Sequence, residues 1–469
     1  MSDDDLIYMS AGDLVRGYER HDFSPVDVAE AVFARIDAVD GRLNAFREVD
    51  REGGMAGARE SAQRWKDGSP LSPIDGVPTT IKDLFDIRGF PTLRGSKTSD
   101  TAKAEGDAPT PARLRAAGAV IIGKTNTPEY GWKGVTDSPL CGITRNPWNT
   151  DTTPGGSSGG ASAACAAGMG VLHLGTDGGG SIRIPAAFSG IFGHKPSFGR
   201  VPYYPPSPMG SLAHSGPLTR TVADSLLMLN VMTGEDTTDW ATMPSQPVPA
   251  RVLSEGVKGL RIAYSPDLGH ARVDEEVAAS VRAAAEALSE LGAEVVETDP
   301  GIGDTVEIFN TLWQSGAHGA LRNLPEEKRA MLDPGLAGVL EKARSISLGE
   351  YMDAQRLRAL VGTHMKQFMT GFDALITPAL SVPAFGAGRL VPEGWDEESS
   401  NGWVAWTPFS YPFNLTQQPA CSVPCGFSSG GLPIGLQIVG RMFDDATVLR
   451  IAAAYEEANP VAALRRPEL

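Results

Sequence analysis

Two glycine-rich segments, each carrying a serine, constrain this chain more than any other feature of its sequence. Residues 154–160 contain Ser157, and residues 176–183 contain Ser181, which follows 24 positions later. An alanine-rich helical pattern and a short apolar run over residues 171–174 separate the two segments. A helix followed by a strand of this length can bring its two ends back to nearly the same place. The two serines are therefore predicted to meet in one site, for which the rest of the chain must supply a base.

Strand and helix patterns alternate along most of the chain, which predicts an α/β fold. One strand is expected to end on Lys82, a second covers residues 119–123, and a third covers residues 372–378. A helix is expected over residues 219–232, and a strand–helix–strand unit follows it. Such alternation favours a mainly parallel sheet that is covered by helices.

We expect a single domain over residues 1–469, with two less typical regions. Residues 1–66 are predicted to form a helical N-terminal arm, in which Ser24 caps a helix that ends at Gly41. The arm is expected to lie on the surface or against a partner subunit. Residues from approximately 235 to 400 are predicted to form a smaller lobe, inserted on the main sheet, and loops of a substrate pocket.

The charge of the chain excludes several classes of function. The chain has 41 Lys and Arg against 57 Asp and Glu, a formal net charge of −16. It gains nothing from counterion release on a phosphate backbone, so no nucleic-acid partner is expected. No apolar run approaches about 18 residues, so no membrane partner is expected. The acidic residues 1–5 lack the positive charge of a secretory signal, and a cytoplasmic protein is expected.

Cysteine and histidine usage gives no sign of a metal site or a disulfide framework. The chain has 4 cysteines in 469 residues, and its 7 histidines form no HxH or HxxxH pair. No metal and no cofactor are therefore expected.

Four interpretations compete for the two glycine-rich segments. A flexible linker is disfavoured by the strand and helix patterns around the glycines, and a phosphate-binding loop by the lack of a GK[ST] ending. Residues 155–159 satisfy the G-x-S-x-G pattern of a nucleophile elbow, for which His214 or His364 would be the base. An elbow follows directly on an apolar strand, however, whereas residues 148–154 have the composition of a loop.

The fourth interpretation is a site of two serines and a lysine. A serine hydroxyl is a poor nucleophile without a neighbouring base, and a lysine is a base only when it is neutral. Burial can lower the pKa of a lysine from about 10.4 by several units. Lys82 ends a strand in an apolar, proline-rich segment, which suits this requirement better than the position of a surface lysine.

Motifs along nearly the whole chain resemble those of the amidase signature family. The agreeing segments are residues 76–83, 123–126, 146–148, 154–160, 176–183, 193–197, 215–217, 221–224 and 431–437. The resemblance is least specific over residues 1–60 and roughly 235–400. It implies the family fold, an α/β structure with a large, twisted, mainly parallel mixed β-sheet, helices on both faces and an N-terminal helical arm.

The resemblance also implies the roles of the site residues. Ser181 is expected to be the nucleophile, Ser157 the proton relay and Lys82 the base. The other residues implied are the oxyanion-hole glycines Gly178, Gly179 and Gly180, Gly156 of a cis peptide bond to Ser157, and the supporting residues Thr176, Asp177 and Arg183. Many family members carry Thr, Ile or Val in place of Gly178, so a more flexible loop or a roomier pocket is expected here.

The expected activity is hydrolysis of a small amide, such as an aryl amide or a carbamate, with some esterase activity, through an acyl-enzyme on Ser181. Tyr130, Trp132 and Gly155 are expected in the substrate pocket. The aromatic residues within 384–418 either wall this pocket or belong to the core.

The expected partners are the small amide substrate and water, and a homodimer is suggested by the arms of relatives. The alternative function is that of the A subunit of a glutamyl-tRNA amidotransferase. The Asp-Gln that usually precedes Gly-Pro in that subunit is absent here, where the sequence reads Ala213-His214-Ser215-Gly216-Pro217. This departure favours a free-standing amidase.

Overall fold

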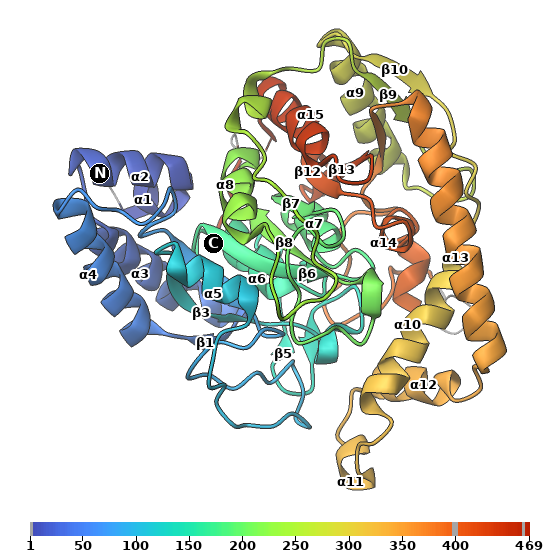
Figure 1. Ribbon diagram of the computed structural model, residues 1–469, viewed down its shortest axis with the longest axis horizontal. Helices are drawn as coiled ribbons and strands as arrows, with labels where there is room; N and C mark the ends of the chain where they lie inside the picture. Colours follow the sequence, from blue (N-terminus) through green and yellow to red (C-terminus); the bar gives the residue numbers. More distant parts are fainter. Residues whose placement is uncertain (1–2, 396–401, 462–464) are drawn as a thin grey trace.

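One β-sheet of eleven strands runs through the described part of the chain (Figure 1). The structure, a computed structural model, describes residues 3–395, 402–461 and 465–469. In spatial order the strands are β1 (Phe46–Val49), β3 (Val120–Thr125), β2 (Pro78–Lys82), β6 (Leu172–Asp177), β8 (His214–Thr219), β7 (Phe192–Lys195), β12 (Ala420–Phe427), β13 (Pro433–Gly440), β11 (Ala374–Pro378), β9 (Arg261–Tyr264) and β10 (Glu294–Glu297). Two short strands, β4 (Asp137–Ser138) and β5 (Gly142–Ile143), form a separate ribbon.

The sheet is mixed, as predicted, but its parallel pairs are confined to two blocks. Strand β2 runs parallel to β3 and β6, and β9 runs parallel to β10 and β11. The described strands between these blocks pair antiparallel, as does β1 at the edge. Strands β12 and β13 illustrate the reason, because residues 428–432 join them as a hairpin and a short connection permits only antiparallel pairing. The proportion of parallel pairing is thus lower than the sequence pattern predicted.

Helices cover both faces of the sheet, which confirms the predicted fold class. The α-helices are α1 (Asp3–Tyr8), α2 (Ala11–Arg20), α3 (Pro25–Leu43), α4 (Arg51–Lys66), α5 (Pro109–Ala116), α6 (Gly159–Ala166), α7 (Arg183–Ser189), α8 (Val222–Met232), α9 (Glu275–Glu290), α10 (Val306–Leu321), α11 (Glu326–Arg329), α12 (Pro334–Ala343), α13 (Leu348–Phe368), α14 (Pro412–Leu415) and α15 (Asp445–Ala458). Short 3₁₀ helices are η1 (Glu129–Gly131), η2 (Gly210–Leu212), η3 (Ala250–Ser254), η4 (Met369–Gly371) and η5 (Gly402–Trp406). Among the described helices, none is both long enough and apolar enough to cross a membrane.

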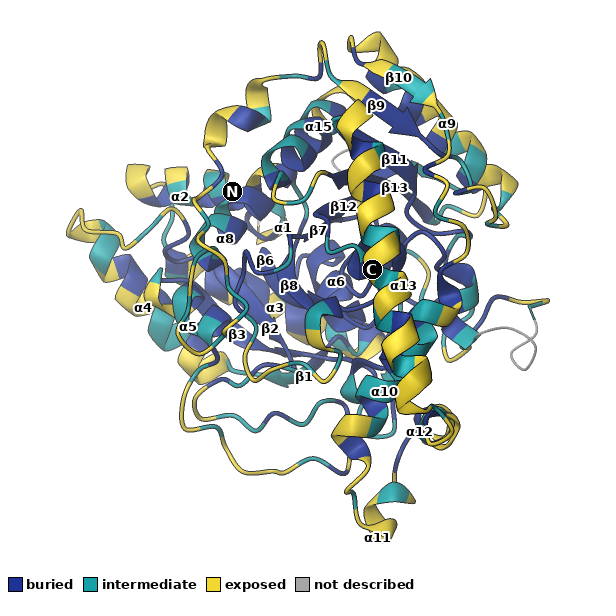
Figure 2. Ribbon diagram, turned by 45° about the vertical axis from the view of Figure 1, so that its right-hand side comes forward, coloured by how far each residue is buried: buried dark blue, intermediate teal, exposed yellow. Residues whose placement is uncertain are grey.

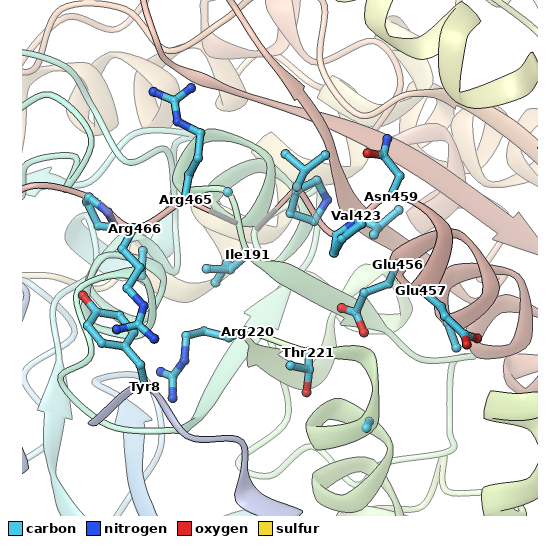
Figure 3. A pocket seen from close by; sticks show the side chains of 18 of the residues that line it. Tyr8, Ile191, Arg220, Thr221, Val423, Glu456, Glu457, Asn459, Arg465 and Arg466 are labelled. Atoms are coloured by element: carbon cyan, nitrogen blue, oxygen red, sulfur yellow. The ribbon is translucent and has the colours of Figure 1, made fainter. Parts of the chain in front are cut away.

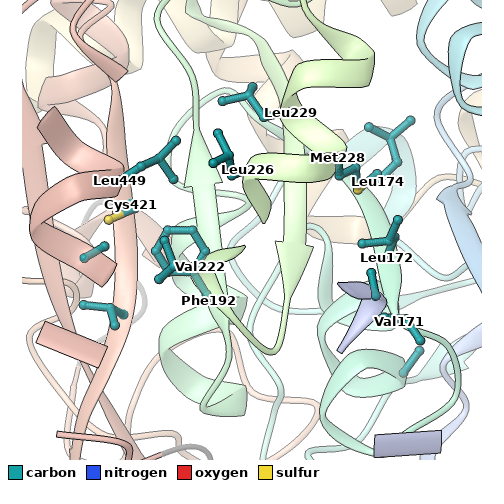
Figure 4. Close-up of a cluster of buried hydrophobic side chains, with 14 of the residues drawn as sticks. Val171, Leu172, Leu174, Phe192, Val222, Leu226, Met228, Leu229, Cys421 and Leu449 are labelled. Carbon is teal, nitrogen blue, oxygen red and sulfur yellow. The ribbon is translucent and has the colours of Figure 1, made fainter. Parts of the chain in front are cut away.

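The largest hydrophobic cluster joins the sheet to helices α1 to α6 and to helices α8, α9 and α15. Figure 4 shows Leu226 of α8 in one layer with Phe192 of β7, Leu174 of β6 and Leu449 of α15. A smaller cluster joins α6 and α7 and includes Leu218 of β8. Each large apolar side chain that is fully buried contributes about 1.5–3 kcal/mol. The strands that carry the glycine-rich segments are therefore fixed by apolar packing.

The N-terminal region is helical, with one strand that the sequence analysis did not predict. Ser24 and Asp27 form the capping box that starts α3, as expected for its first turn. The helix continues past Gly41 and ends at Leu43, where Asn44 in the left-handed conformation forms the C-cap. Strand β1 follows and pairs with β3, so this region is joined to the edge of the main sheet.

The region from residue 235 to 395 also contributes to the main sheet. Strands β9, β10 and β11 extend it beyond β13. Helices α10 to α13 lie along one side of the molecule, opposite α1 to α4 (Figure 1). Figure 2 shows that α13 is exposed along much of its outer face. Helix α10, in contrast, is half buried and reaches the site described next.

Candidate active site

Two neighbouring parallel strands bring the lysine and the two serine segments together. Strands β2 and β6 pair with Ile81 opposite Leu174, so both strands end at the same edge of the sheet. Lys82 is the last residue of β2, and the segment with Ser181 follows β6. Ser157 precedes α6, and its Oγ lies 2.7 Å from the Nζ of Lys82. The predicted meeting of the two segments is reinforced by a hydrogen bond of 3.2 Å from the Ser158 N–H to the Ser181 carbonyl.

Lys82 is fully buried, and the polar atoms around its amine are hydroxyls. Its Nζ lies 2.7 Å from Ser157 Oγ, 2.9 Å from Ser158 Oγ and 2.8 Å from Thr176 Oγ1. Among the described residues no carboxylate forms an ion pair with it. Burial lowers the pKa of Lys82 well below its ordinary value, against the opposing influence of the Asp177 charge. A neutral amine at this position can accept a proton from a hydroxyl group.

The backbone around the serines approaches its neighbours so closely that glycine is required. Gly180 has a φ of +120°, and a Cβ there would lie 2.5 Å from the Cβ of Ser410. A Cβ on Gly179 would lie 2.6 Å from the ring of Phe309. The peptide bond between Gly156 and Ser157 is cis, as the family resemblance implied. These contacts explain why the two segments are rich in glycine.

A buried ion pair holds the loop that carries Ser181. Asp177 accepts hydrogen bonds from the Arg183 Nε and Nη2 at 2.9 Å each, and from the Gly180 N–H at 2.8 Å. Arg183 also donates to Asn414 Oδ1 at 2.7 Å and Gln437 Oε1 at 2.8 Å. Burial alone would raise the pKa of Asp177, but the charge and hydrogen bonds of Arg183 outweigh it and hold the pKa well below its usual range.

We expect Asp177→Asn to destabilise the fold by about 3–5 kcal/mol, because it leaves the buried Arg183 guanidinium without its counter-charge. Urea unfolding measures the loss of free energy. The double variant Asp177→Asn/Arg183→Met should lose less than the sum of the two single losses. Strictly additive losses would show that the two side chains are not energetically coupled.

The two serines open into a cavity of about 500 Å³. Tyr130 and Trp132 line it, at the positions expected from the sequence. Gly155 does not line it, which corrects the expectation for that residue. A Cβ on Gly155 would lie 3.0 Å from the Cα of Pro185, because this part of the segment packs against α7.

Sequence reasoning missed the wall of the cavity that α10 provides. Trp313, Ala317 and Leu321 of this helix line the cavity, although no motif marks them. A Cβ on Gly178 would lie 3.0 Å from the Cζ3 of Trp313. The indole thus occupies space that a side chain at position 178 would need, so the missing side chain does not leave a larger pocket.

The aromatic residues of the described part of 384–418 belong to the core, which was one of the two expectations. Trp403 packs against the loop of residues 178–180, and a Cβ on Gly179 would lie 3.0 Å from its ring. Trp403, Trp406 and Tyr411 join one hydrophobic cluster, and Phe409 and Phe413 join another. None of these five lines the catalytic cavity.

The histidines proposed for a nucleophile elbow have other partners. The Nδ1 of His214 lies 2.9 Å from the Leu212 carbonyl oxygen, and the Nε2 of His364 lies 2.6 Å from the Pro300 carbonyl oxygen. Ser157 has the amine of Lys82 as its neighbour instead. The described residues contain no group of three or more His, Cys, Asp or Glu that could hold a metal ion.

A second cavity, of about 530 Å³, lies near the C-terminal end of α15 (Figure 3). It is lined by Tyr8, Arg220, Glu456 and other residues, and the guanidinium of Arg466 lies 4.3 Å from the centre of the Tyr8 ring. Its described lining includes neither serine of the glycine-rich segments. Of these two cavities, the one of about 500 Å³ is therefore the one that contains Ser157 and Ser181.

Comparison with known proteins gives this arrangement a family. The sequence model of the family named Amidase matches residues 27–449. The chain belongs to the amidase family. An acylamidase of Rhodococcus erythropolis is 39% identical over 470 residues, with 98% of this chain and 97% of the relative covered.

Two further relatives of this amidase show that the family includes both an amidotransferase subunit and an aryl acylamidase. The A subunit of a glutamyl-tRNA(Gln) amidotransferase from Myxococcus xanthus is 37% identical over 468 residues, with 93% of this chain and 94% of the relative covered. The crystal structure of a bacterial aryl acylamidase, an amidase signature enzyme, matches with a TM-score of 0.90 and 31% identity over 97% of each chain. The predicted family, fold and enzyme class are therefore confirmed: the chain is an amide-hydrolysing enzyme.

Proposed function

We propose that this enzyme hydrolyses a small amide through a covalent acyl-enzyme on Ser181, with Ser157 as proton relay and Lys82 as base. One observation carries this proposal. The fully buried Lys82 amine has three hydroxyl neighbours, and the nearest belongs to Ser157 at 2.7 Å. An uncharged amine beside a serine hydroxyl is the arrangement that activates a serine without histidine.

In the first half of the reaction, Ser181 Oγ attacks the amide carbonyl carbon. Its proton passes to Ser157, whose own proton passes to the neutral amine of Lys82. The carbonyl oxygen becomes an oxyanion, which the backbone N–H groups of Gly178, Gly179 and Ser181 stabilise. Gly180, although expected in the oxyanion hole, does not contribute its N–H, because that group already donates to Asp177. The site keeps its total charge, because the new negative charge on the oxyanion is balanced by the lysine ammonium.

In the second half, the oxyanion reforms the carbonyl and the carbon–nitrogen bond breaks. Ser157 gives its proton to the departing amine and regains one from Lys82. A water molecule then attacks the acyl carbon and passes one proton through Ser157 to Lys82. The bond between the acyl carbon and Ser181 Oγ breaks, Ser181 Oγ takes that proton back through Ser157, and the carboxylic acid leaves. The enzyme returns to its starting state with one amide bond and one water consumed.

We propose that the substrate has an apolar acyl or amine group, with aryl amides first and carbamates and esters next. The cavity walls are formed mainly by aromatic, aliphatic and proline side chains. The names of two relatives, an acylamidase and an aryl acylamidase, agree with such a substrate.

Labelling with a serine-directed fluorophosphonate tests the assignment of the nucleophile. Peptide mass mapping of the labelled chain is expected to place the adduct on Ser181, and Lys82→Ala should prevent it. The same preparation, without a partner protein, should hydrolyse 4-nitroacetanilide. An adduct on Ser157 would favour the nucleophile elbow, and an unlabelled, inactive chain would favour an amidotransferase subunit that requires its partner.

We also propose a cytoplasmic location and a homodimer. All four cysteines are free, which is typical of a reducing compartment. The homodimer rests on the resemblance to relatives with N-terminal arms. Sedimentation equilibrium tests it, and the mass of a single chain at micromolar concentration would contradict it.

A further inference from the structure

Arg94 is a single charge in an otherwise uncharged cavity. Among the described residues that line the catalytic cavity, it is the one with a charged side chain. Its Nη1 donates to the Thr92 carbonyl at 3.0 Å, and in the described chain no carboxylate forms an ion pair with it. Arg94 is half-buried, and an arginine beside mainly apolar walls gains more from an anion than one in bulk water.

The backbone of Arg94 is held in an unfavourable conformation at this place. Arg94 has a φ of +54° and Tyr130 a φ of +52°, both in the left-handed region that non-glycine residues avoid. The Tyr130 N–H donates to the Arg94 carbonyl at 2.7 Å, and both residues line the cavity. Such conformations persist only where the surroundings enforce them, and they concentrate at ligand sites.

Contacts on both sides fix the loop that carries Arg94. A Cβ on Gly95 would lie 2.5 Å from the Thr127 carbonyl oxygen, so the loop is pressed against the backbone next to Tyr130. The Ser96 hydroxyl lies 2.6 Å from Glu129 Oε1, and the Thr98 hydroxyl lies 2.7 Å from the Tyr130 hydroxyl. The backbone that carries Arg94 is therefore held in place before any substrate enters, which lowers the entropy lost on binding.

We propose that Arg94 binds a carboxylate of the substrate, so that the enzyme takes amides in which an apolar segment separates an acidic group from the scissile bond. A guanidinium offers two parallel N–H donors that match a carboxylate. The inference rests on the proposed function, because it places the scissile amide at Ser181. The carboxylate can belong to the acyl part or to the amine part, and the experiment distinguishes the two.

Equilibrium binding to the Ser181→Ala variant tests the proposal without turnover. Isothermal titration calorimetry compares glutaryl-4-nitroanilide with pentanoyl-4-nitroanilide, which probes a carboxylate on the acyl side. It also compares 5-acetamido-2-nitrobenzoate with 4-nitroacetanilide, which probes the amine side. In one pair the acid should bind about tenfold to a hundredfold more tightly than its neutral match.

Substitutions in the same Ser181→Ala background identify the group responsible. Arg94→Gln keeps a long side chain at the left-handed position and should reduce the acid-to-neutral ratio to about one. Arg94→Lys should keep part of the preference, because lysine retains the positive charge but lacks the two parallel N–H donors of the guanidinium. Lys97→Gln removes an exposed charge from the same loop, outside the cavity lining, and should keep the full preference.

Two results would overturn the proposal: neither acid binds more tightly than its neutral match, or the preference survives in Arg94→Gln. Because the measurement needs no hydrolysis, it gives the same answer whether or not Ser181 is the nucleophile. Failure of the wild-type chain to hydrolyse any of the four anilides would count against the proposed function alone.

Discussion

Replacing Ser181 by alanine is expected to abolish amide hydrolysis while the fold remains intact. The substitution removes the oxygen that would form the acyl bond, and removal of a catalytic serine costs about 10⁴-fold or more in turnover. Among the described contacts, the Ser181 hydroxyl makes no hydrogen bond that its loss would break. Steady-state assays with 4-nitroacetanilide measure the rate, and circular dichroism with thermal melting checks the fold.

Ser189→Ala is the matched control for this experiment. Ser189 is also buried and lies eight positions further along, at the end of α7, where its hydroxyl is 2.9 Å from that of Ser162. Its loss should cost about 1 kcal/mol of stability and leave acylation unaffected. If Ser181→Ala kept more than about one hundredth of the wild-type rate, the nucleophile would have to be sought elsewhere, first at Ser157.

The parts of the site that the sequence predicted well are those built from local patterns. The strand that ends on Lys82 was predicted from the turn residues before it and the apolar, proline-rich segment around it. The meeting of Ser157 and Ser181 was predicted from the one helix and one strand between them. Both inferences needed only the geometry of a short connection. The family resemblance then supplied the roles that spacing alone left open.

The walls of the cavity could not be predicted in this way, because they come from distant segments. Trp313 reaches the glycine loop from α10, more than a hundred positions beyond Gly178, and its apolar pattern reads as an ordinary core helix. Arg94 lies in a loop of glycine, proline and threonine in which charge normally indicates exposure. Only tertiary packing turns that loop toward the cavity.

The expected effect of Gly178 illustrates how packing can reverse a local inference. A position that lacks the side chain found in many relatives suggests a roomier pocket. In the fold, the Trp313 ring lies so near that even a Cβ would be crowded, at 3.0 Å. The space that Gly178 leaves is thus filled by Trp313, so the volume of the pocket here depends on both residues together.

Lys82→Met is expected to lower kcat/KM by about 10³-fold or more, because methionine fills a similar volume but accepts no proton. In the wild-type enzyme, kcat/KM should rise with pH as Lys82 loses its proton. Burial lowers the pKa of this group, so the rising limb should lie below the ordinary value of 10.5. A pH–rate profile of both proteins measures this, and the limb should be absent from any residual activity of the variant.

Lys195 is the matched control, because the titration of a second buried lysine could also make kcat/KM rise with pH. It is fully buried, and burial together with the Arg183 charge lowers its pKa to about 7. Its Nζ contacts the backbone carbonyls of Pro196 and Gln418, and it does not line the cavity. Lys195→Met should therefore keep the rising limb, and its loss in this variant rather than in Lys82→Met would assign the base to Lys195.

The same lowered pKa makes a prediction about stability that is independent of catalysis. Between the folded-state pKa of Lys82 and 10.5, the unfolded chain binds a proton that the folded chain does not. The free energy of unfolding that Lys82 contributes must therefore increase with pH through this window and become constant above it. The difference in unfolding free energy between wild type and Lys82→Met, from urea titrations at several pH values, should shift in favour of wild type as the pH rises. Because Lys195 is present in both proteins, its own titration cancels, and a difference that does not change with pH would mean that Lys82 is not neutralised by burial.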